Sequence, residues 1–210
     1  MHAEASGPLE TELQTARLLL RAPRHADAAR ITALANDEGV ASMTARLPYP
    51  YRIEDAHAFI AGRGGLGGGP EAALDMVFVI ERLGDGEILG SIGLAQKNAG
   101  TATLGFWLGR RHWGAGYATE AARAVVDHLF EATHAGAVVA SVRVINEASR
   151  RVVEKCGLRY VESGLEPAPA RGGALPVDRF RLSRRDWESF KAWRPALVRA
   201  RTATEVLAPG

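Results

Sequence analysis

The sequence predicts an α+β fold, in which helices pack on a mixed, mostly antiparallel central sheet. Three observations lead to this class. Three runs of strand length follow one another between residues 75 and 108 and are joined by turn signals. Residues 114–131 then carry the clearest helical periodicity of the chain. A strand, a helix and a further strand follow, which completes the pattern of a layered α+β structure.

The amino-terminal part of the chain is predicted to hold one strand and two helices. The strand covers residues 15–21, "TARLLLR", and ends before Pro23. The first helix covers residues 27–40, where apolar residues recur at helical spacing. The second helix covers residues 53–61 and carries acidic residues in its first turn, which the helix dipole favours.

A glycine-rich segment, "GRGGLGGGP" at residues 62–70, follows the second helix and contains six glycines. Such a loop suggests phosphate binding, and a nucleotide-binding α/β protein that uses residues 62–69 is one alternative for the whole chain. However, the segment lacks the Lys-Ser/Thr ending of a P-loop and leads into no evident helix. These features favour a flexible connector.

A three-stranded antiparallel meander is predicted at residues 75–82, 88–95 and 103–108. The first run, "DMVFVIER", is rich in Val, Ile and Phe. The sequence "GDGE" at residues 84–87 signals a tight turn into the second run, and "KNAGT" at residues 97–101 signals a turn into the third.

The longest helix is predicted over residues 114–131, because its apolar residues recur at i, i+3, i+4 and i+7 and form one broad face. These residues are Ala118, Ala121, Ala122, Val125, Val126, Leu129 and Phe130. The remaining predicted elements are a strand at 137–144, a helix at 147–156, strands at 158–161 and 177–182, and a helix at 183–193 that Ser183 and Asp186 begin in the manner of a capping box.

Composition points to one globular domain, residues 14–193, between flexible ends at residues 1–13 and 194–210. The 26 basic and 24 acidic residues give a formal charge of +2, too small to signal a nucleic-acid surface. A single cysteine excludes a disulfide framework, and no cluster of Cys and His suggests a metal. No apolar run approaches a membrane span, and the acidic amino terminus is unlike a secretory signal, so we expect a soluble, cytoplasmic protein.

The segment that carries chemistry is "LGFWLGRRHWGAG", residues 104–116. A strand runs into a loop with Gly109, Gly114 and Gly116, and the longest helix begins there. The first N–H groups of a helix have no intrahelical partner, and glycines let successive N–H groups converge on an anion. Arg110 and Arg111 add positive charge. The pattern predicts a backbone site for a diphosphate, and the alternative is a plain strand-to-helix turn.

Two motifs resemble those of a known family. Arg111-x-x-Gly114-x-Gly116 followed by "YATEA" resembles the acetyl-CoA loop of the GNAT N-acetyltransferases. "NEASRRVVEKCGLRYV", residues 146–161, resembles the family's next motif, Asn-x-x-Ser before a helix that ends in Glu-Lys-x-Gly-Phe, with Leu158 in place of the Phe. "TARLLLR" and "FRLSRRDW", at residues 180–187, resemble the RimJ/RimL-like branch.

The resemblance implies a GNAT fold whose sheet splays between the fourth and fifth strands, with the pantetheine arm of acetyl-CoA in the gap. The pyrophosphate would bind N–H groups from Arg111 to Ala118, and the acetyl carbonyl would accept an N–H near Trp107 or Leu108. No metal is required. The cofactor-binding residues so implied are Phe106, Trp107, Leu108, Arg111, His112, Trp113, Gly114, Ala115, Gly116, Tyr117, Ala118, Asn146 and Ser149.

The family pattern also implies two catalytic residues, Ser149 and Asn146. Many members carry a Tyr seven residues after the motif Asn as the proton donor to the leaving thiolate, but this chain has Val153 there. We therefore assign proton donation or hydrogen bonding at the CoA sulfur to Ser149, and orientation of the pantetheine to Asn146. The alternative for Ser149 is a first-turn residue that only satisfies the backbone.

The general base is not evident, because Thr103 stands where related sequences often carry a Glu. Glu81, Glu162 and Asp178 are candidates, although each reads more readily as a solvated surface carboxylate. An α-amine has a pKa of about 7.7–8.0 and lysine one near 10.4, a difference of about 2.5 units or on the order of 3.5 kcal/mol. A weak base therefore favours a peptide α-amine or a small amine over lysine.

Several neighbouring side chains admit two interpretations. Cys156 reads as a small core residue rather than a nucleophile, and Glu120 as a first-turn residue that supports the helix dipole. Trp107 and Trp113 either wall the cofactor groove or pack in the core, and His112 either contacts phosphate or is exposed in its loop. Lastly, an exposed basic face and contacts with the CoA phosphates are both open for Arg150, Arg151 and Lys155.

These observations predict an acetyl-CoA-dependent N-acetyltransferase that acts on a primary amine, by direct attack in a ternary complex. The amine would belong to a peptide or protein N-terminus or to a small molecule, and would enter between residues 24–62 and the strand at 177–182. A homodimer is possible in this branch, and neither nucleic acid nor a membrane is expected as a partner. The alternative from another class is a CoA-binding sensor with reduced catalysis, which Thr103 and Val153 favour.

Overall fold

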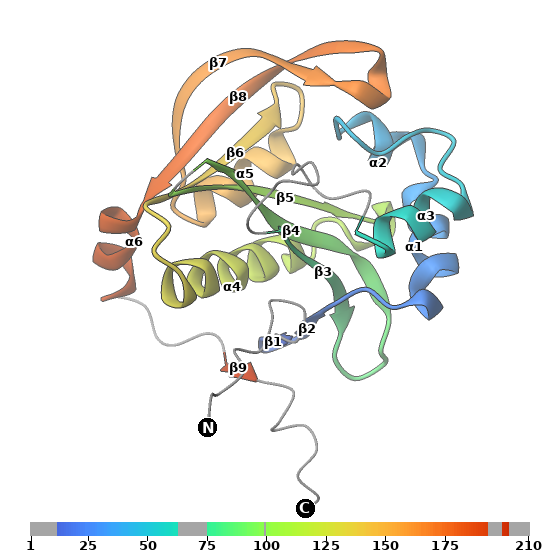
Figure 1. Cartoon of the computed structure of the whole chain (residues 1–210), viewed down its shortest axis with the longest axis horizontal. Helices are drawn as coiled ribbons and strands as arrows, with labels where there is room; N and C mark the ends of the chain where they lie inside the picture. The colour runs from blue at the N-terminus through green and yellow to red at the C-terminus, as the bar shows by residue number, and fades with distance from the viewer. Residues whose placement is uncertain (1–11, 63–74, 99, 193–198, 202–210) are drawn as a thin grey trace, which may run out of the picture.

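The computed structural model describes residues 12–62, 75–98, 100–192 and 199–201. Its strands form one nine-stranded sheet in the order β7-β8-β6-β5-β4-β3-β2-β1-β9 (Figure 1). The strands are β1 (Glu12–Gln14), β2 (Leu18–Arg21), β3 (Asp75–Arg82), β4 (Ile88–Asn98), β5 (Thr101–Leu108), β6 (Ala137–Arg143), β7 (Arg159–Ala168), β8 (Gly173–Ser183) and β9 (Arg199–Arg201). The α-helices are α1 (Ala28–Ala35), α2 (Glu38–Ser42), α3 (Ile53–Ile60), α4 (Tyr117–Ala132), α5 (Glu147–Lys155) and α6 (Arg184–Lys191).

The predicted α+β class is confirmed, because the sheet is antiparallel throughout except between β5 and β6. This parallel pair holds only three residue pairs, from Thr101↔Ala137 to Thr103↔Val139. Beyond Thr103, β5 stays paired with β4 as far as Leu108 but leaves β6. The predicted splay between the fourth and fifth strands is therefore present, and it frees one backbone edge of β5.

Helices cover both faces of the sheet. Alternate residues of a strand point to opposite faces, and in β3 they pack into two different clusters. Ile80 of β3 belongs to the larger core, with the apolar face of α4 against the sheet. Its neighbour Val79 belongs to a second cluster, together with Ile31 of α1 and Ala56 of α3. The periodicity of α4 correctly predicted its buried side except at Ala118, which is only partly buried.

The predicted helix over residues 27–40 is wrong in one respect, since the chain forms two helices there. Asn36 leaves the helical region with ψ of 54°, and α1 ends. Asp37 then begins α2, where its Oδ1 accepts the N–H of Val40 at 3.0 Å. A polar Asn-Asp pair competes for backbone hydrogen bonds, which is the physical reason for the break.

The hairpin of β7 and β8 is much longer than the strands predicted at 158–161 and 177–182. Most of β7 is exposed, so it lacks the apolar alternation that identifies a half-buried strand. A short 3₁₀ turn, Pro169–Arg171, joins the two strands. The tip of the hairpin lies beside α2, where the N–H of Ala170 donates to the carbonyl of Ala45 at 3.2 Å (Figure 1).

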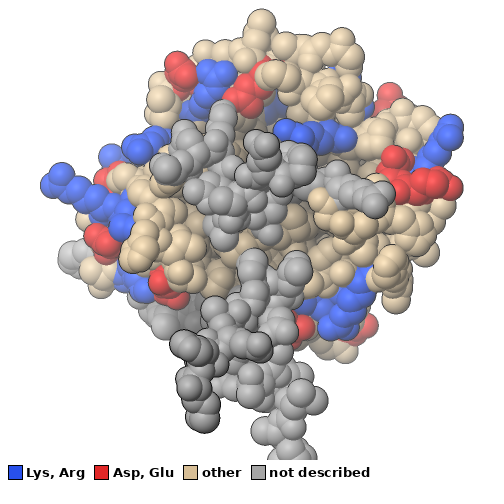
Figure 2. All heavy atoms as spheres, viewed as in Figure 1, with Lys and Arg blue, Asp and Glu red and all other residues tan. Residues whose placement is uncertain are grey.

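Both chain ends contribute short strands. Glu12–Gln14 lies partly in the segment expected to be a flexible amino terminus, and Arg199–Arg201 lies in the segment expected to be a flexible tail, yet the two pair antiparallel. Residues 63–70 of the glycine-rich segment lie outside the described part of the chain. None of the described helices combines the length and apolar character needed to cross a membrane. Figure 2 shows basic side chains next to acidic ones around the rim of one face.

Candidate active site

A cavity of about 470 Å³ opens where β5 leaves β6. The end of β5, the loop that follows it, the start of α4 and the start of α5 form its walls. Of the thirteen residues predicted to bind the cofactor, eleven line this cavity: Phe106, Trp107, Leu108, His112, Trp113, Gly114, Gly116, Tyr117, Ala118, Asn146 and Ser149. Arg111 and Ala115 do not. The structure thus brings together two sequence motifs that lie about thirty residues apart.

The loop before α4 has the backbone geometry that its glycines predicted. Gly114 and Gly116 have φ of 78° and 82°, in the left-handed region that side chains disfavour. Gly116 is the N-cap of α4 and supplies no side-chain cap, so the first-turn N–H groups remain for another acceptor. Because residues of this turn line the cavity, its wall carries the partial positive charge of the helix N-terminus.

Arg17 supports this loop from outside the cavity, and its role was not predicted from the sequence. Its Nη1 donates to the carbonyl of Ala115 at 3.1 Å, and its Nε donates to Glu120 at 2.7 Å. Its guanidinium also lies over the ring of Tyr117, 4.6 Å from the centroid. Glu120 further accepts from Thr15 Oγ1 at 2.6 Å, so it links the first strands to α4 rather than acting only on the dipole.

The hydrogen bonds of Glu120 also set its pKa. Burial raises the pKa of this carboxyl, but the hydrogen bonds from Thr15 and Arg17 outweigh it, and the pKa is lowered. Glu120 is therefore held as a carboxylate. Because Arg17 binds both this carboxylate and the carbonyl of Ala115, it fixes the loop against the first turn of α4.

The two loop arginines, expected to add positive charge beside the loop, are both engaged in ion pairs. Arg110 Nη2 donates to Asp37 Oδ1 of α2 at 2.9 Å, and this pairing lowers the pKa of Asp37. Arg111 Nη2 donates to Glu87 Oε1 at 2.6 Å. Each guanidinium therefore fastens the loop to a neighbouring element.

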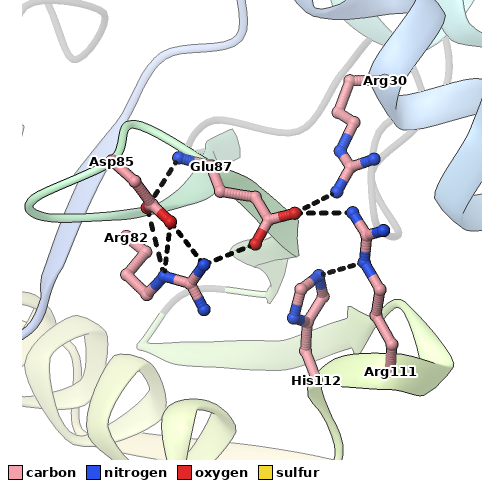
Figure 3. A network of polar contacts seen from close by, with 6 residues as sticks. All are labelled: Arg30, Arg82, Asp85, Glu87, Arg111 and His112. Atoms are coloured by element: carbon pink, nitrogen blue, oxygen red, sulfur yellow. Dashed lines mark hydrogen bonds and ion pairs between the residues drawn. The ribbon is translucent and has the colours of Figure 1, made fainter.

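Glu87 is the centre of the polar network in Figure 3, at the turn between β3 and β4. Its Oε1 accepts from Arg30 at 2.5 Å as well as from Arg111, and its Oε2 accepts from Arg82 at 2.6 Å. Asp85 binds the same Arg82. One carboxylate thus joins α1, the β3–β4 turn and the loop before α4.

His112 is buried, with 6% of its surface exposed, so the interpretation of an exposed loop histidine is wrong. Its Nε2 accepts the Nε–H of Arg111 at 3.1 Å, which leaves Nδ1 as the protonated nitrogen of the neutral ring (Figure 3). Burial lowers its pKa, and the charge of Glu87 opposes this only in part. A neutral His112 therefore lines the cavity.

The two tryptophans take different positions. Trp107 is 7% exposed and packs in the smaller cluster while one side lines the cavity. Trp113 is 44% exposed, and its Nε1 donates to the carbonyl of Leu108 at 2.8 Å. Trp113 thereby holds the end of β5 at Leu108. The family resemblance placed the backbone N–H that binds the acetyl carbonyl at this end, near Trp107 or Leu108.

Asn146 and Ser149 lie together at the start of α5. Asn146 is the N-cap, and its Oδ1 accepts the N–H of Ser149 at 3.0 Å. The backbone of Ser149 thus fills a structural role, while its Oγ makes no hydrogen bond with the described residues and its side chain lines the cavity. Val153, by contrast, is fully buried in the core and does not face the cavity.

The basic residues of α5 divide between the two interpretations. Arg151 and Lys155 line the cavity, on the side of the α4 N-terminus. Arg150 instead donates to Glu154 at 3.0 Å and to Asp178 at 3.2 Å. Cys156 is 2% exposed within the core and does not line the cavity, so it is placed as the sequence predicted.

A second cavity of about 370 Å³ adjoins the first. It extends from the splay towards α3, the loop after α2 and the β7–β8 hairpin, which is the predicted entry of the acceptor. Six residues line both cavities: Met43, Thr44, Phe106, Trp107, Asn146 and Ser149. A molecule in each cavity would therefore meet beside Ser149.

None of the carboxylates considered as bases, Glu81, Glu162 and Asp178, lines either cavity. They were expected to be solvated surface groups, and for two of them this expectation is wrong. Asp178 is 8% exposed and accepts from Ser163 Oγ at 2.6 Å. Glu81 accepts from the buried Arg21 at 2.6 Å. The carboxylates in the second cavity are Asp55 and Glu166, which no sequence signal identified. The residues described contain no group of three or more His, Cys, Asp or Glu side chains placed to hold a metal.

A family model described as "Acetyltransferase (GNAT) domain" matches residues 17–159. YkkB of Bacillus subtilis, an uncharacterized protein, is 39% identical over 87 residues, which are 40% of this chain and 51% of that protein. The chain thus spans about half the length of this curated relative.

Solved structures with the same fold cover nearly all of this domain. A GNAT-family acetyltransferase from Bacillus anthracis has a TM-score of 0.71 and 20% sequence identity to this chain. The alignment covers 83% of this chain and 99% of the Bacillus anthracis chain. RimL, a ribosomal L7/L12 α-N-protein acetyltransferase in complex with coenzyme A, has a TM-score of 0.65 and 17% identity, and covers 80% of this chain and 95% of that one.

Proposed function

The chain belongs to the GNAT acetyltransferase family, and on that premise we propose that it transfers an acetyl group from acetyl-CoA to a primary amine. The observation that carries this proposal is the pair of adjoining cavities that share Asn146 and Ser149. The first has the chemistry of a CoA site, and the second leaves room for an amine. Because the cavities adjoin, acetyl-CoA in the first and an amine in the second could be bound at the same time. We therefore propose that the amine attacks acetyl-CoA directly in a ternary complex, without a covalent enzyme intermediate.

The residues of the first cavity fit the charge distribution of coenzyme A. Its pyrophosphate suits the N–H groups after Gly114 and Gly116, because left-handed glycines allow successive N–H groups to converge on an anion. Arg151 and Lys155 suit further phosphate oxygens. The free edge of β5 beyond Thr103 suits the amide groups of the pantetheine arm. Acetyl-CoA when bound supplies the thioester.

Ser149 is proposed to give a proton to the sulfur as the C–S bond breaks and to take one back from water, and Asn146 to orient the pantetheine. The amine nitrogen attacks the acetyl carbon, a new C–N bond forms, and the nitrogen loses one proton. The oxyanion is stabilised by a backbone N–H of the Trp107–Leu108 segment, whose carbonyl at Leu108 is already held by Trp113. Cys156 takes no part, because it is enclosed in the core.

Asp55 and Glu166 replace the missing Glu at Thr103 as groups that receive the amine proton, directly or through water. Both line the second cavity, as does Thr103, the last β5 residue paired with β6. Glu166 accepts from Ser141 Oγ at 2.8 Å, which fixes the position of its carboxyl group. A weak base of this kind favours an α-amine or another amine of low pKa, as in the RimJ/RimL-like branch to which we assign the chain.

The test of this function is turnover with a panel of primary amines: peptides with free N-termini, amino acids, polyamines and lysine side chains. We expect acetylation of an α-amine or small amine, with one CoA released per acetylated product. Rapid lysine acetylation with no α-amine product would contradict the substrate class, and CoA binding without turnover would favour the sensor. A cytoplasmic location and a homodimer are also proposed, and light scattering tests the latter.

A further inference from the structure

The second cavity carries more unpaired positive charge than a plain amine site requires. Four charged side chains line it: Arg46, Asp55, Arg143 and Glu166. Glu166 is already paired, since Arg179 Nε donates to its Oε1 at 2.9 Å. Within the described ranges, neither arginine of the cavity wall forms an ion pair. The wall therefore presents two guanidinium groups that no described carboxylate neutralises.

Arg143, at the end of β6, is the more constrained of the two. Its side chain is half-buried, and its Nη1 donates to the carbonyl of Ser42. Its Nε is buried and has no hydrogen-bond partner among the described residues. Buried guanidinium groups normally have their donors satisfied and their charge paired, so this setting is costly without a further partner.

Arg171, at the tip of the β7–β8 hairpin, repeats this pattern beside Arg143. Its Nη2 donates to the carbonyls of Ala41 and Leu47, and its Nε is also buried without a partner. Burial lowers the pKa of Arg171, and the positive charge of Arg143 lowers it further, so the two guanidinium groups repel each other. Both hold the end of α2, and Arg171 also holds the loop after it, whose residues 43–47 line the cavity.

We propose that Arg143 binds an oxyanion carried by the acceptor, a carboxylate or a phosphate, so that the substrate is an amine that also bears negative charge. This inference rests on the proposed acetyl transfer and narrows its acceptor. A guanidinium fork matches both oxyanions in geometry, and a ligand anion would compensate the unpaired charge at Arg143. Arg46 adds attraction at the same wall, while Asp55 and Glu166 accommodate the amine end.

The test compares acceptors that differ only in the anion. Ala-Glu-amide and Ala-Gln-amide have the same α-amine, and phosphoethanolamine and ethanolamine extend the comparison to phosphate. For the wild-type protein we expect kcat/KM to favour one anionic member at least tenfold, and the pair that shows this identifies the oxyanion. In Arg143→Gln the ratio should fall to about one. Arg181→Gln, an exposed arginine on the adjoining strand β8, is the matched control and should keep the wild-type ratio.

A purely structural role of Arg143 would lower stability and all activities together without changing this ratio. If Arg143→Gln does not fold, Arg143→Lys provides a second test. It keeps the positive charge and should retain part of the preference for anionic acceptors. Equal turnover of anionic and neutral acceptors, or a preference that survives in Arg143→Gln, overturns the inference and leaves acetyl transfer standing. Absence of turnover with every amine overturns both.

Discussion

Gly90 of β4 determines how closely β5 approaches at the end that carries the proposed oxyanion donor. It pairs with Leu108, and a Cβ at this position would lie 2.1 Å from the carbonyl oxygen of Trp107 and 2.8 Å from the Cα of Leu108. Both atoms belong to the backbone and have no rotamer into which to retreat. Gly90→Ala therefore has to push β5 away from β4.

The size of this displacement follows from the contact distances. An ordinary contact begins near 3.4 Å, so the strands must separate by more than 1 Å at Trp107. Overpacking of this kind costs about 3 kcal/mol, at the upper end of its usual range. For a chain of this size that corresponds to a fall in Tm of about 6–12 °C. A 1 Å misplacement of a group that stabilises the transition state costs about 100-fold in rate.

The assay measures Tm and kcat for Gly90→Ala beside Gly173→Ala. The control glycine lies in strand β8, and its added Cβ would meet nothing within 4 Å. We expect Gly173→Ala to resemble the wild type, and Gly90→Ala to lose both stability and about two orders of magnitude in kcat. If Gly90→Ala is destabilised but turns over at the wild-type rate, the end of β5 does not supply the oxyanion donor.

Two further substitutions test the network around the cavity and the stability of the fold. Glu87→Gln releases Arg111 and should raise the KM for acetyl-CoA about three- to tenfold with little change in kcat, an effect that steady-state kinetics at low and high salt would detect. An unchanged KM would show that the loop needs no anchor there. Asp27→Asn breaks the buried ion pair with Arg21, at 2.8 Å, and should cost about 3–5 kcal/mol near pH 7. Burial raises the pKa of Asp27, but the hydrogen bonds from Arg21 and the Arg24 N–H outweigh it, so the folded-state pKa lies below 3.8. The pair therefore stabilises the fold fully above that pH, and the difference between wild type and variant in thermal unfolding should shrink as pH falls below about 4. A difference independent of pH would mean that the charge of Asp27 is not what stabilises the fold.

Local patterns predicted the parts of the fold that depend on local chemistry. The apolar stripe of α4 and the glycines at 114 and 116 each require one conformation, and both predictions agree with the structure. The break between α1 and α2 was missed, because Asp37 caps the N–H of Val40 and begins a new helix, which the apolar spacing of residues 27–40 does not reveal. The long β7–β8 hairpin was missed because its first strand is exposed and carries no alternation.

The cavity-lining residues were predicted where a motif encoded them and missed where distant segments meet. Asn146 and Ser149 were identified from the resemblance of residues 146–161 to a family motif, and both line the two cavities. The pairing of Arg111 with Glu87 joins residues 24 positions apart, and Arg17 reaches Glu120 across 103 positions. Likewise, Arg143 of β6 contacts Ser42 at the end of α2, a helix that no sequence pattern connects to β6.

The measurement that tests the central claim most directly is the release of free CoA thiol from acetyl-CoA in the presence of an amine acceptor, together with the formation of the acetylated amine, for wild type, Ser149→Ala and Ser189→Ala. Ser189 is an exposed serine of α6, whose Oγ donates only to the carbonyl of Arg185 among the described residues. We predict stoichiometric thiol and product for the wild type and for Ser189→Ala, and a rate at least tenfold lower for Ser149→Ala with little change in Tm. Wild-type turnover in Ser149→Ala would contradict the assigned proton donor. No thiol release by the wild-type protein with any amine would contradict acetyl transfer itself.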